Sequence, residues 1–296
     1  MGKLGGLMAF VKAAELGSLV QAGRALEMSA SAVGKAVTRL EEELGVRLLE
    51  RTTRRVQLTD EGRHFHERCQ RILEDLDDAQ TMLSRSQEVP RGRLRVSAPI
   101  VSHHFLVPLI PGFLDRYPDI ELDMSFNDRS LDLIEHGIHV AIRSGDLPDS
   151  NLISRPLQSF RLLLCASPTY LNTHGIPRTP SELTGHVAIR FRHPNSGKLL
   201  EWPLNATDTQ DLSGLRTVLA CNNIEAVLGA TLRHVGIACM PDFLVRTALA
   251  QTQLVSVLDE YVNGDGRYSL LWPAGRHQSP KVRAFIDYLG QQLVDG

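Results

Sequence analysis

The first sixty residues carry apolar side chains at helical spacing, interrupted by residues that end helices. A first helix is expected to end near Gly17. A second helix begins after Ser18, which forms a capping box with Gln21, and runs to about Glu27. The apolar face of the first helix consists of Leu7, Phe10, Val11 and Ala14. These short helices predict a small helical domain at the start of the chain.

A third helix is expected to begin after its capping residue Ser29 and to end at Gly45. Its core-facing residues recur at steps of four, three and four, and they are Val33, Val37, Leu40 and Leu44. The opposite face carries small polar and basic side chains, namely Ser31, Lys35 and Thr38. Two short helices joined by a tight turn, the second exposing such side chains near its start, are typical of a helix-turn-helix that enters the major groove of DNA.

A β-hairpin is predicted directly after this helix, with short strands at residues 46–49 and 56–58. Basic residues crowd the hairpin against a single acidic residue, Glu50. They are Arg47, Arg51, Arg54 and Arg55. A positive patch of this kind suits phosphate contacts or insertion into a narrow minor groove, so we interpret the hairpin as the wing of a DNA-binding domain. A solvated charged hairpin without DNA contacts is the alternative.

A long helix of roughly 40 Å, at 1.5 Å per residue, is expected from Thr59 to about Gln87. Asp60 and Glu61 supply an acidic first turn, which favours a helix N-terminus. Apolar residues along the helix alternate steps of four and three, the a/d pattern of a short coiled coil between two chains. They are Phe65, Cys69, Ile72, Leu76, Ala79 and Leu83. The pattern predicts a homodimer, and packing of the stripe against its own domain is the alternative that the spacing leaves open.

Beyond Pro90 and Gly92, short apolar strands alternate with helices, which is typical of an open α/β sheet. A first series has strands at 94–98, 120–126 and 139–143, with helices near 104–117 and 131–136. A second series has strands at 162–166, 187–191, 216–220, 236–240 and 268–272, with helices at 224–235 and from about 280. We expect parallel sheets built from crossover units and divided into two lobes. The chain is expected to cross between the lobes near 144–159 and to return near 259–267.

Ligands of open α/β sheets bind beyond the carboxyl ends of the strands, where polar side chains and free N–H groups gather. The candidate ligand-binding residues at these strand ends are Ser97, Pro99, Ile100, Asn127, Arg143, Phe191, Asn222, Asn223 and Pro241. Asn127 or Asn222 could instead cap a helix, Phe191 could belong to the core and Arg143 could form a structural ion pair. A guanidinium pairs with a carboxylate through two hydrogen bonds, so Arg143 favours an organic anion as the ligand.

Residues of the first domain also match a known family at its own spacing. The matching residues are Phe10-Val11, Ala14-Glu15, Gly17-Ser18, Ala25-Leu26, Met28-Ser29, Ser31-Ala32-Val33, Arg39-Leu40-Glu41, Leu44-Gly45-Val46-Arg47-Leu48-Leu49, Arg51-Thr52 and Leu58-Thr59 to Gly62. On these residues the chain resembles the LysR-type transcriptional regulators. The resemblance implies a multi-domain protein: an all-α winged helix-turn-helix, a long linker helix, and a two-lobed α/β effector domain similar to periplasmic binding proteins.

The resemblance also divides the chain into three parts. Residues 1–59 would form the DNA-binding domain, 60–89 the linker and dimerisation helix, and 90–296 the effector-binding domain. The lobes of the effector-binding domain would be about 90–158 with 268–296 for lobe one, and about 159–267 for lobe two.

The implied function is sequence-specific regulation of transcription. A dimer or tetramer would bind a palindromic, inverted-repeat operator in double-stranded DNA, and a small-molecule effector between the two lobes would control it. RNA polymerase is a further candidate partner. The candidate DNA-binding residues are Ser29, Ala30, Ser31, Gly34, Lys35, Thr38, Arg39, Arg51, Arg54 and Arg55.

The recognition helix departs from the residues common in the family at three positions. Ala30 stands where many members carry Gln or Pro, Gly34 where they often carry Ser, and Ala36 where Gln is common. Loss of an amide at Ala30 or Ala36 removes a bidentate reader of adenine, so the operator sequence cannot be transferred from the family. Gly34 costs about 1 kcal/mol relative to Ala inside a helix, and it either lets the DNA backbone approach closely or is simply tolerated.

Composition and charge narrow the picture further. A net charge of −2 means that any DNA-binding surface must come from local clusters of Lys and Arg. With 43% apolar and 22% charged residues, the chain has ordinary globular usage. The sequence shows neither an export signal nor an apolar run long enough to span a membrane, so we expect a cytoplasmic protein.

Signals for catalytic or metal-binding sites are weaker than the signals for DNA binding. The four cysteines (Cys69, Cys165, Cys221 and Cys239) are scattered, so we expect reduced, mostly buried thiols, with a redox pair of Cys221 and Cys239 as the alternative. Histidine pairs occur at 64 and 66, 103 and 104, and 136 and 139, but without an acidic or cysteine partner at diagnostic spacing. We therefore expect no metal, no cofactor and no enzymatic activity. The alternative function is a solute-binding protein or small α/β enzyme, and the basic wing counts against both.

Overall fold

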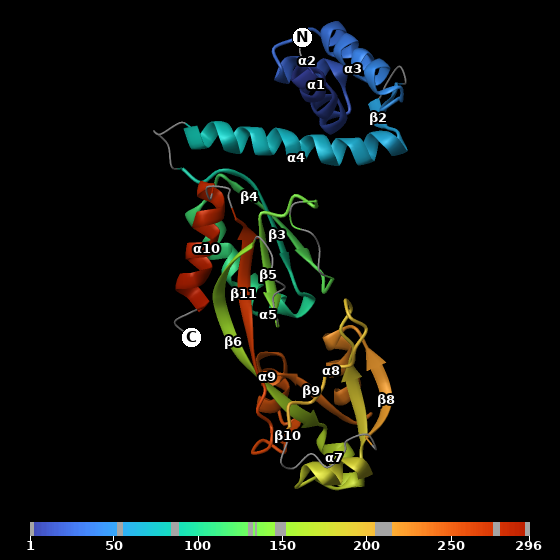
Figure 1. The fold of residues 1–296 in the computed structure, drawn as a ribbon, viewed down its shortest axis with the longest axis vertical. Coiled ribbons are helices and arrows are strands. Elements are labelled where there is room, and N and C mark those ends of the chain that lie inside the picture. The colour runs from blue at the N-terminus through green and yellow to red at the C-terminus, as the bar shows by residue number, and fades with distance from the viewer. Residues whose placement is uncertain are drawn as a thin grey trace. The chain divides into compact units, whose positions relative to one another are not determined.

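The computed structural model describes the chain at residues 3–51, 56–83, 89–129, 133, 135–145, 152–204, 215–274 and 279–293. The chain divides into two compact units, Met1–Glu88 and Val89–Gly296 (Figure 1). In the described residues, the first unit is helical with a two-stranded hairpin, and the second is built around a nine-stranded sheet.

Three short helices form the core of the first unit, and local capping sets their ends. They are α1 (Lys3–Leu16), α2 (Leu19–Ala25) and α3 (Ala30–Leu44). Ser18 Oγ accepts a hydrogen bond from the Gln21 backbone N–H at 3.3 Å, and Ser29 Oγ accepts one from the Ala32 N–H at 3.1 Å. Gly45 ends α3 in the left-handed region, at φ 72°. The predicted starts of α2 and α3 and the stop at Gly45 are confirmed.

The hairpin after α3 consists of two short strands, β1 (Leu49–Arg51) and β2 (Val56–Leu58). The second strand lies where the sequence places it, but the first begins at Leu49 rather than at residue 46. Glu41 of α3 explains the difference, because its Oε1 accepts hydrogen bonds from the backbone N–H groups of Leu48 and Leu49, at 2.9 and 3.0 Å. This carboxylate binds the N–H groups that a longer strand would need, and it fastens the hairpin to α3.

The long helix α4 (Asp60–Leu83) follows the hairpin and is capped by the hydroxyl of Thr59. Its first turns pack onto α1 within the same unit. The rings of Phe65 and Phe10 lie 5.7 Å apart between centroids, and Cys69 is completely buried. The beginning of α4 is therefore part of the core of the first unit.

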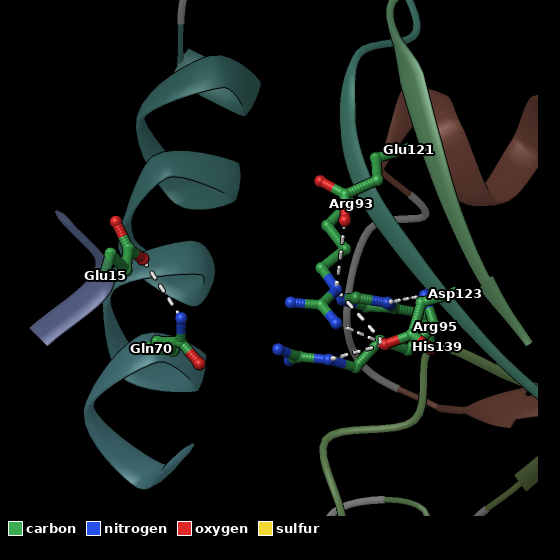
Figure 2. A network of polar contacts seen from close by, with 7 residues as sticks. All are labelled: Glu15, Gln70, Arg93, Arg95, Glu121, Asp123 and His139. Carbon is green, nitrogen blue, oxygen red and sulfur yellow. Dashed lines mark hydrogen bonds and ion pairs between the residues drawn. The ribbon is translucent and has the colours of Figure 1, made fainter. Parts of the chain in front are cut away.

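The predicted dimer seam along α4 is wrong at its first two positions. Phe65 and Cys69 pack into the core of their own unit. One residue beyond Cys69, Gln70 Nε2 donates to Glu15 Oε1 of α1 at 3.0 Å (Figure 2). Heptad spacing reveals an apolar stripe, but the same spacing serves for packing against α1 and for packing against a second chain.

The later positions of the stripe are exposed where the structure describes them. Ile72 is 52% exposed and Leu76 is 36% exposed. The side chains of Ala79 and Leu83, and the predicted helix end near Gln87, lie outside the described residues. The apolar stripe thus leaves the core of its own unit beyond Cys69.

The sheet of the second unit has its strands in the order β4-β3-β5-β11-β6-β9-β7-β8, and β10 also pairs with β6. Lobe one contains β3 (Gly92–Ala98), β4 (Ile120–Phe126) and β5 (Val140–Ser144). Lobe two contains β7 (Val187–Phe191), β8 (Arg216–Cys221), β9 (Ile237–Pro241) and β10 (Val255–Val257). Two long strands connect the lobes, β6 (Leu152–Ala166) and β11 (Asp265–Pro273).

The connection between the lobes is an antiparallel strand pair, and its strands begin before the strands predicted at 162–166 and 268–272 (Figure 1). β6 pairs with β11 from Leu152 to Arg161 and with β9 from Leu162 to Cys165, so one continuous strand crosses from lobe one to lobe two. The first half of β6 is mostly exposed or half-buried and therefore lacks the apolar pattern by which strands are recognised. β6 begins within the predicted crossing segment 144–159, and β11 begins within the predicted return segment 259–267.

The sheet is mixed rather than parallel throughout. β3 runs parallel to β4 and β5, and β7 runs parallel to β8 and β9, as predicted. β6 and β11 are antiparallel to their neighbours because one enters lobe two and the other returns from it. Ser144 at the end of β5 pairs with Tyr268, and Pro241 at the end of β9 pairs with Leu162. The carboxyl ends of both parallel sets therefore face the junction between the lobes.

Short helices cover the sheet, and prolines break the helix predicted at 104–117. Pro108 and Pro111 each lie in the first turn of a new segment, where a missing N–H is tolerated. The resulting segments are η1 (Ile100–Ser102), α5 (His103–Leu106), η2 (Val107–Leu109) and α6 (Ile110–Arg116). The other helices are α7 (Pro168–His174), η3 (Pro180–Gly185), α8 (Ile224–Leu232), α9 (Asp242–Ala250) and α10 (Pro280–Leu293). Of the helix predicted at 131–136, residues 131, 132 and 134 lie outside the described residues, and residues 133, 135 and 136 form turns instead of a helix.

The two faces of the lobe-one sheet differ in character. Leu94 of β3 is completely buried in the main core, to which α10 also contributes. On the opposite face, Arg93 donates from Nη2 and Nε to Asp123 Oδ2 of β4, at 2.8 and 3.1 Å (Figure 2). The Arg95 backbone N–H donates to His139 Nδ1 at 2.8 Å and so joins β3 to the start of β5. Among the described helices, none is both long and apolar enough to cross a bilayer.

Candidate DNA-binding and effector-binding sites

The exposed face of α3 presents polar and basic side chains at successive turns. Ser31, Lys35 and Arg39 are exposed there, and Ser29 caps the start of the helix. Arg39 Nε lies 3.2 Å from Glu43 Oε1, but both side chains are open to solvent, so this ion pair contributes little and leaves the guanidinium able to turn to a phosphate. Ala30 is half-buried in the first turn. The arrangement can offer both helix N–H groups and cations to nucleic acid.

Two predicted contact residues are turned away from this face. Gly34 is buried, so the expectation that it admits the DNA backbone is wrong, because its surroundings are residues of its own domain. Thr38 is half-buried and donates from its hydroxyl to the Gly34 carbonyl oxygen at 3.0 Å. The side chain of Arg51 and all of Arg54 and Arg55 lie outside the described residues.

Two residues that the sequence analysis missed hold the DNA-binding elements in place. A Cβ atom at Gly23 of α2 would lie 2.6 Å from the Met28 carbonyl oxygen, so only glycine lets α2 approach the turn before α3 so closely. Glu41 binds the hairpin to α3 through the N–H groups of Leu48 and Leu49. Gly23 thus fixes the turn before α3, and Glu41 fixes the hairpin after it.

In the second unit, the predicted strand-end residues of lobe one come together. Arg143 Nη2 donates to Ser97 Oγ at 2.8 Å, and Asn127 Nδ2 lies 3.4 Å from the same oxygen. Arg143 also donates from Nη1 to the Ile142 carbonyl at 2.7 Å. Burial lowers the pKa of Arg143, and the negative charge of Asp128 partly offsets this. The guanidinium is therefore a largely desolvated cation at the end of β5.

The loop after β3 completes this group. The Ile100 backbone N–H donates to Asp128 Oδ1 at 2.9 Å, and Ser102 Oγ donates to the Pro99 carbonyl at 2.6 Å. Asn127 Oδ1 is buried and accepts no hydrogen bond from the described residues. A buried acceptor without a donor is uncommon in proteins, so this oxygen offers a position for a ligand N–H or O–H group.

A cluster of aromatic rings at the lobe junction was not predicted. Tyr268 of β11 is 2% exposed, and its ring lies 5.1 Å from both Phe105 and Phe160 and 6.1 Å from Phe243 of lobe two. Burial, with the nearby charge of Asp128, raises the pKa of Tyr268 well above its ordinary value. The phenol therefore stays neutral, and the cluster joins the lobes through apolar contacts.

The predicted residues of lobe two have more varied environments. Asn223 caps α8, with Oδ1 accepting from the Ala226 N–H at 3.1 Å, so capping, which the sequence analysis considered for Asn222, belongs to Asn223. Asn222 is exposed, Phe191 is half-buried against the main core, and Pro241 is buried. Among the described residues, no hydrogen bond connects these four to Ser97 or Arg143.

The thiols have the environment expected of structural cysteines. Burial raises the pKa of Cys69 to about 11 and those of Cys165 and Cys239 to about 12. Cys221 lies in β8 and Cys239 in β9, with β7 between the two strands. Two strand spacings are about 9.6 Å, beyond the reach of a disulfide, so the alternative of a redox pair is set aside.

A family model described as Bacterial regulatory helix-turn-helix protein, lysR family, matches residues 4–63, and one described as LysR substrate binding domain matches residues 87–294. The chain belongs to the LysR-type transcriptional regulators. This regulator combines a DNA-binding helix-turn-helix with an effector-binding domain. The family is not enzymatic, so the alternatives of a solute-binding protein and of an α/β enzyme are set aside.

Relatives and solved structures extend over nearly the whole regulator. CrgA of Neisseria meningitidis serogroup C is 36% identical over 97% of this chain and 96% of its own length, and the probable regulator LtrA of Klebsiella pneumoniae is 34% identical over 97% and 94%. The CrgA structure covers 97% of both chains with a TM-score of 0.63 at 34% identity. Full-length AphB, a Vibrio cholerae virulence activator, covers 96% and 97% with a TM-score of 0.60 at 30% identity. These likenesses confirm the predicted fold class.

Replacing Glu41 with Ala should loosen the hairpin from α3, because two backbone N–H groups lose their acceptor. We expect the free energy of unfolding of the first unit to fall by roughly 1–3 kcal/mol in urea denaturation followed by circular dichroism. Glu42→Ala is the matched control, since Glu42 is exposed, and should change stability by less than about 0.5 kcal/mol. Equal stabilities of the two variants would show that Glu41 does not hold the wing.

Proposed function

We propose that this LysR-type regulator binds an inverted-repeat operator as a dimer or a pair of dimers, under the control of an organic anion bound between its two lobes. Residues 1–59 bind DNA, residues 60–89 dimerise and residues 90–296 bind the effector. Its place of action is the bacterial cytoplasm, where the DNA lies and where RNA polymerase is a further candidate partner.

The observation that carries the DNA part of this proposal is the exposed face of α3. Ser31, Lys35 and Arg39 are exposed at successive turns of a helix whose opposite side is packed against its own domain. In the sequence, Arg54 and Arg55 lie between the two strands of the hairpin and add two positive charges to this part of the chain. A helix of this kind fits the major groove, and the basic hairpin suits the neighbouring backbone or minor groove.

The dimer rests on the exposed part of the apolar stripe along α4. Ile72 and Leu76 remain open to solvent, and Ala79 and Leu83 continue their spacing in the sequence. A second copy of α4 would bury these side chains, and removing their apolar surface from water favours association. Two identical recognition helices related by a twofold axis read inverted half-sites separated by whole turns of DNA. This seam is shorter than the one that the heptad spacing predicts, because the first two residues of the predicted seam pack in the core of their own unit.

The effector site rests on Arg143 and Asn127 at the strand ends of lobe one. Arg143 is a desolvated cation that hydrogen-bonds neutral oxygens of Ser97 and Ile142. A carboxylate of the ligand would pair with it far more strongly than those oxygens do. Asn127 Oδ1 adds an acceptor, which favours an anion that also carries a hydroxyl or amine. Phe191, Asn222 and Pro241 would face such a ligand from lobe two.

Replacing Lys35 with Ala should weaken binding to any duplex, because a cation at the phosphate backbone releases a counterion. Fluorescence anisotropy with a random-sequence duplex, repeated over a salt series, measures this directly. We expect the plot of log Kd against log salt concentration to become less steep by about 0.9. Lys12→Ala, which removes an exposed lysine from α1, is the control and should leave the slope unchanged. A slope that Lys35→Ala does not alter would remove α3 from the phosphate contacts.

Replacing Arg143 with Gln should abolish the response to anionic ligands. We would screen small mono- and dicarboxylates, with and without hydroxyl or amine groups, for those that raise the melting temperature of the full-length protein. Gln retains hydrogen bonds but loses the charge, so the shift seen in the wild type should disappear. Arg246→Gln removes an exposed arginine of α9 and should retain the shift. A response to no anion, or one that survives Arg143→Gln, would contradict this assignment.

A further inference from the structure

Two histidines of lobe one and a glutamate of lobe two converge where the lobes meet. His103 and His104 begin α5, and Glu225 lies in the first turn of α8. His104 Nε2 is 2.8 Å from Glu225 Oε1. Taking one ligand atom from each of the three side chains, all three atoms lie within 4.8 Å of one another. Glu225 is 121 residues away from His104 along the chain, so local spacing in the sequence does not reveal this acidic partner.

The orientation of His103 is fixed by the backbone. Its Nδ1 lies 2.8 Å from the Ile100 carbonyl oxygen. A carbonyl oxygen can only accept a hydrogen bond, so Nδ1 carries the proton and Nε2 presents its lone pair. Metal-binding histidines are commonly held in this way, with the second ring nitrogen donating to a carbonyl or carboxylate.

We propose that His103, His104 and Glu225 bind a divalent transition-metal ion, Zn²⁺ by the chemistry of the ligands, and that this ion links the two lobes. Two imidazole nitrogens and one carboxylate oxygen are ligands that zinc takes in three-residue sites, with water at the fourth position. Zinc lies about 2.0–2.2 Å from such atoms, which places tetrahedral ligands about 3.3 Å apart. The three candidate ligand atoms, which lie within 4.8 Å of one another, would adjust toward this spacing when an ion binds.

A simple ion pair between His104 and Glu225 explains less of the geometry. Their side chains are 37% and 32% exposed, and ion pairs with this access to solvent contribute little to stability. The ion pair involves only His104 and Glu225, whereas His103 brings a third ligand atom to the same place, with its ring held by the Ile100 carbonyl and packed against the His104 ring. The partial exposure of the group does suit an ion that enters from solvent.

The position of the site gives the ion a structural consequence. α5 belongs to lobe one and α8 to lobe two, so a bound ion would fix the distance between the lobes. Ile100 connects the site to the strand-end group, because its carbonyl holds His103 and its N–H is bound by Asp128. Zinc would therefore stabilise one relative arrangement of the lobes and raise the melting temperature of the second unit.

The test uses full-length protein freed of metal with a chelator and titrated with ZnCl₂ in a calorimeter. We expect one tight site per chain in the wild type. Glu225→Gln can still accept a hydrogen bond from His104 but is a poor zinc ligand, so its affinity should fall by more than roughly 100-fold, since even loss of an outer partner typically costs 10- to 100-fold. Glu225→His restores a zinc ligand with a similar reach from the backbone and should retain tight binding, which a role in hydrogen bonding alone would not predict.

The controls address folding and unrelated histidines. Circular dichroism and the metal-free melting temperature show whether each variant is folded, and His103→Ala provides a second test from the opposite lobe. His193→Ala removes an exposed histidine outside the cluster and should bind zinc as the wild type does. The proposal is overturned if the wild type has no site at micromolar Zn²⁺. It is equally overturned if folded His103→Ala and Glu225→Gln bind zinc as tightly as the wild type.

Discussion

The antiparallel pairing of β6 with β11 is the constraint on which the second unit depends. Because β6 continues from lobe one into lobe two, both lobes share a single sheet path. The pairing of Ser144 with Tyr268 and of Pro241 with Leu162 then turns the carboxyl ends of both parallel strand sets toward the junction. Strand ends are where ligands of α/β sheets bind, so the strand pairing sets the position of the proposed effector site.

The chemistry at the junction follows from this placement. Arg143 ends a strand next to β11, so its guanidinium is partly desolvated and turns to Ser97 of the neighbouring strand. Tyr268 fills the same region with an aromatic ring that contacts residues of both lobes. Small organic ligands bind where apolar rings and a few fixed polar groups come together, and both are present near the junction. The same junction brings Glu225 to His104.

Local chemistry made much of the fold predictable from the sequence. Ser29 and Gly45 set the limits of α3 through contacts with their own neighbours, and the strand at Ile120–Phe126 has the predicted limits. Relations between distant segments were not predictable in this way. Cys69 of the apolar stripe meets α1, although its spacing fits a second chain equally well. The polar first half of β6 looks like a loop until its pairing with β11 is known.

The candidate functional sites likewise include residues that the sequence identifies and residues that only the structure reveals. Ser97, Asn127 and Arg143 were predicted to lie together because parallel strands bring their carboxyl ends to one edge of the sheet, and hydrogen bonds connect them. Glu41 and Glu225 were missed, since one binds backbone groups after a turn and the other meets its partner across the lobes. Gly34 was assigned to DNA from its helix position, but burial depends on how α3 packs in its domain.

We propose that a twofold pair of these chains reads DNA through α3. The decisive experiment is selection of bound duplexes from a random-sequence library by the full-length protein, followed by a footprint on the most enriched sequence. We expect an inverted repeat whose half-sites are separated by one or more whole turns, with both half-sites protected together. A single half-site without a repeat, or no enrichment over the starting library at low salt, would contradict it.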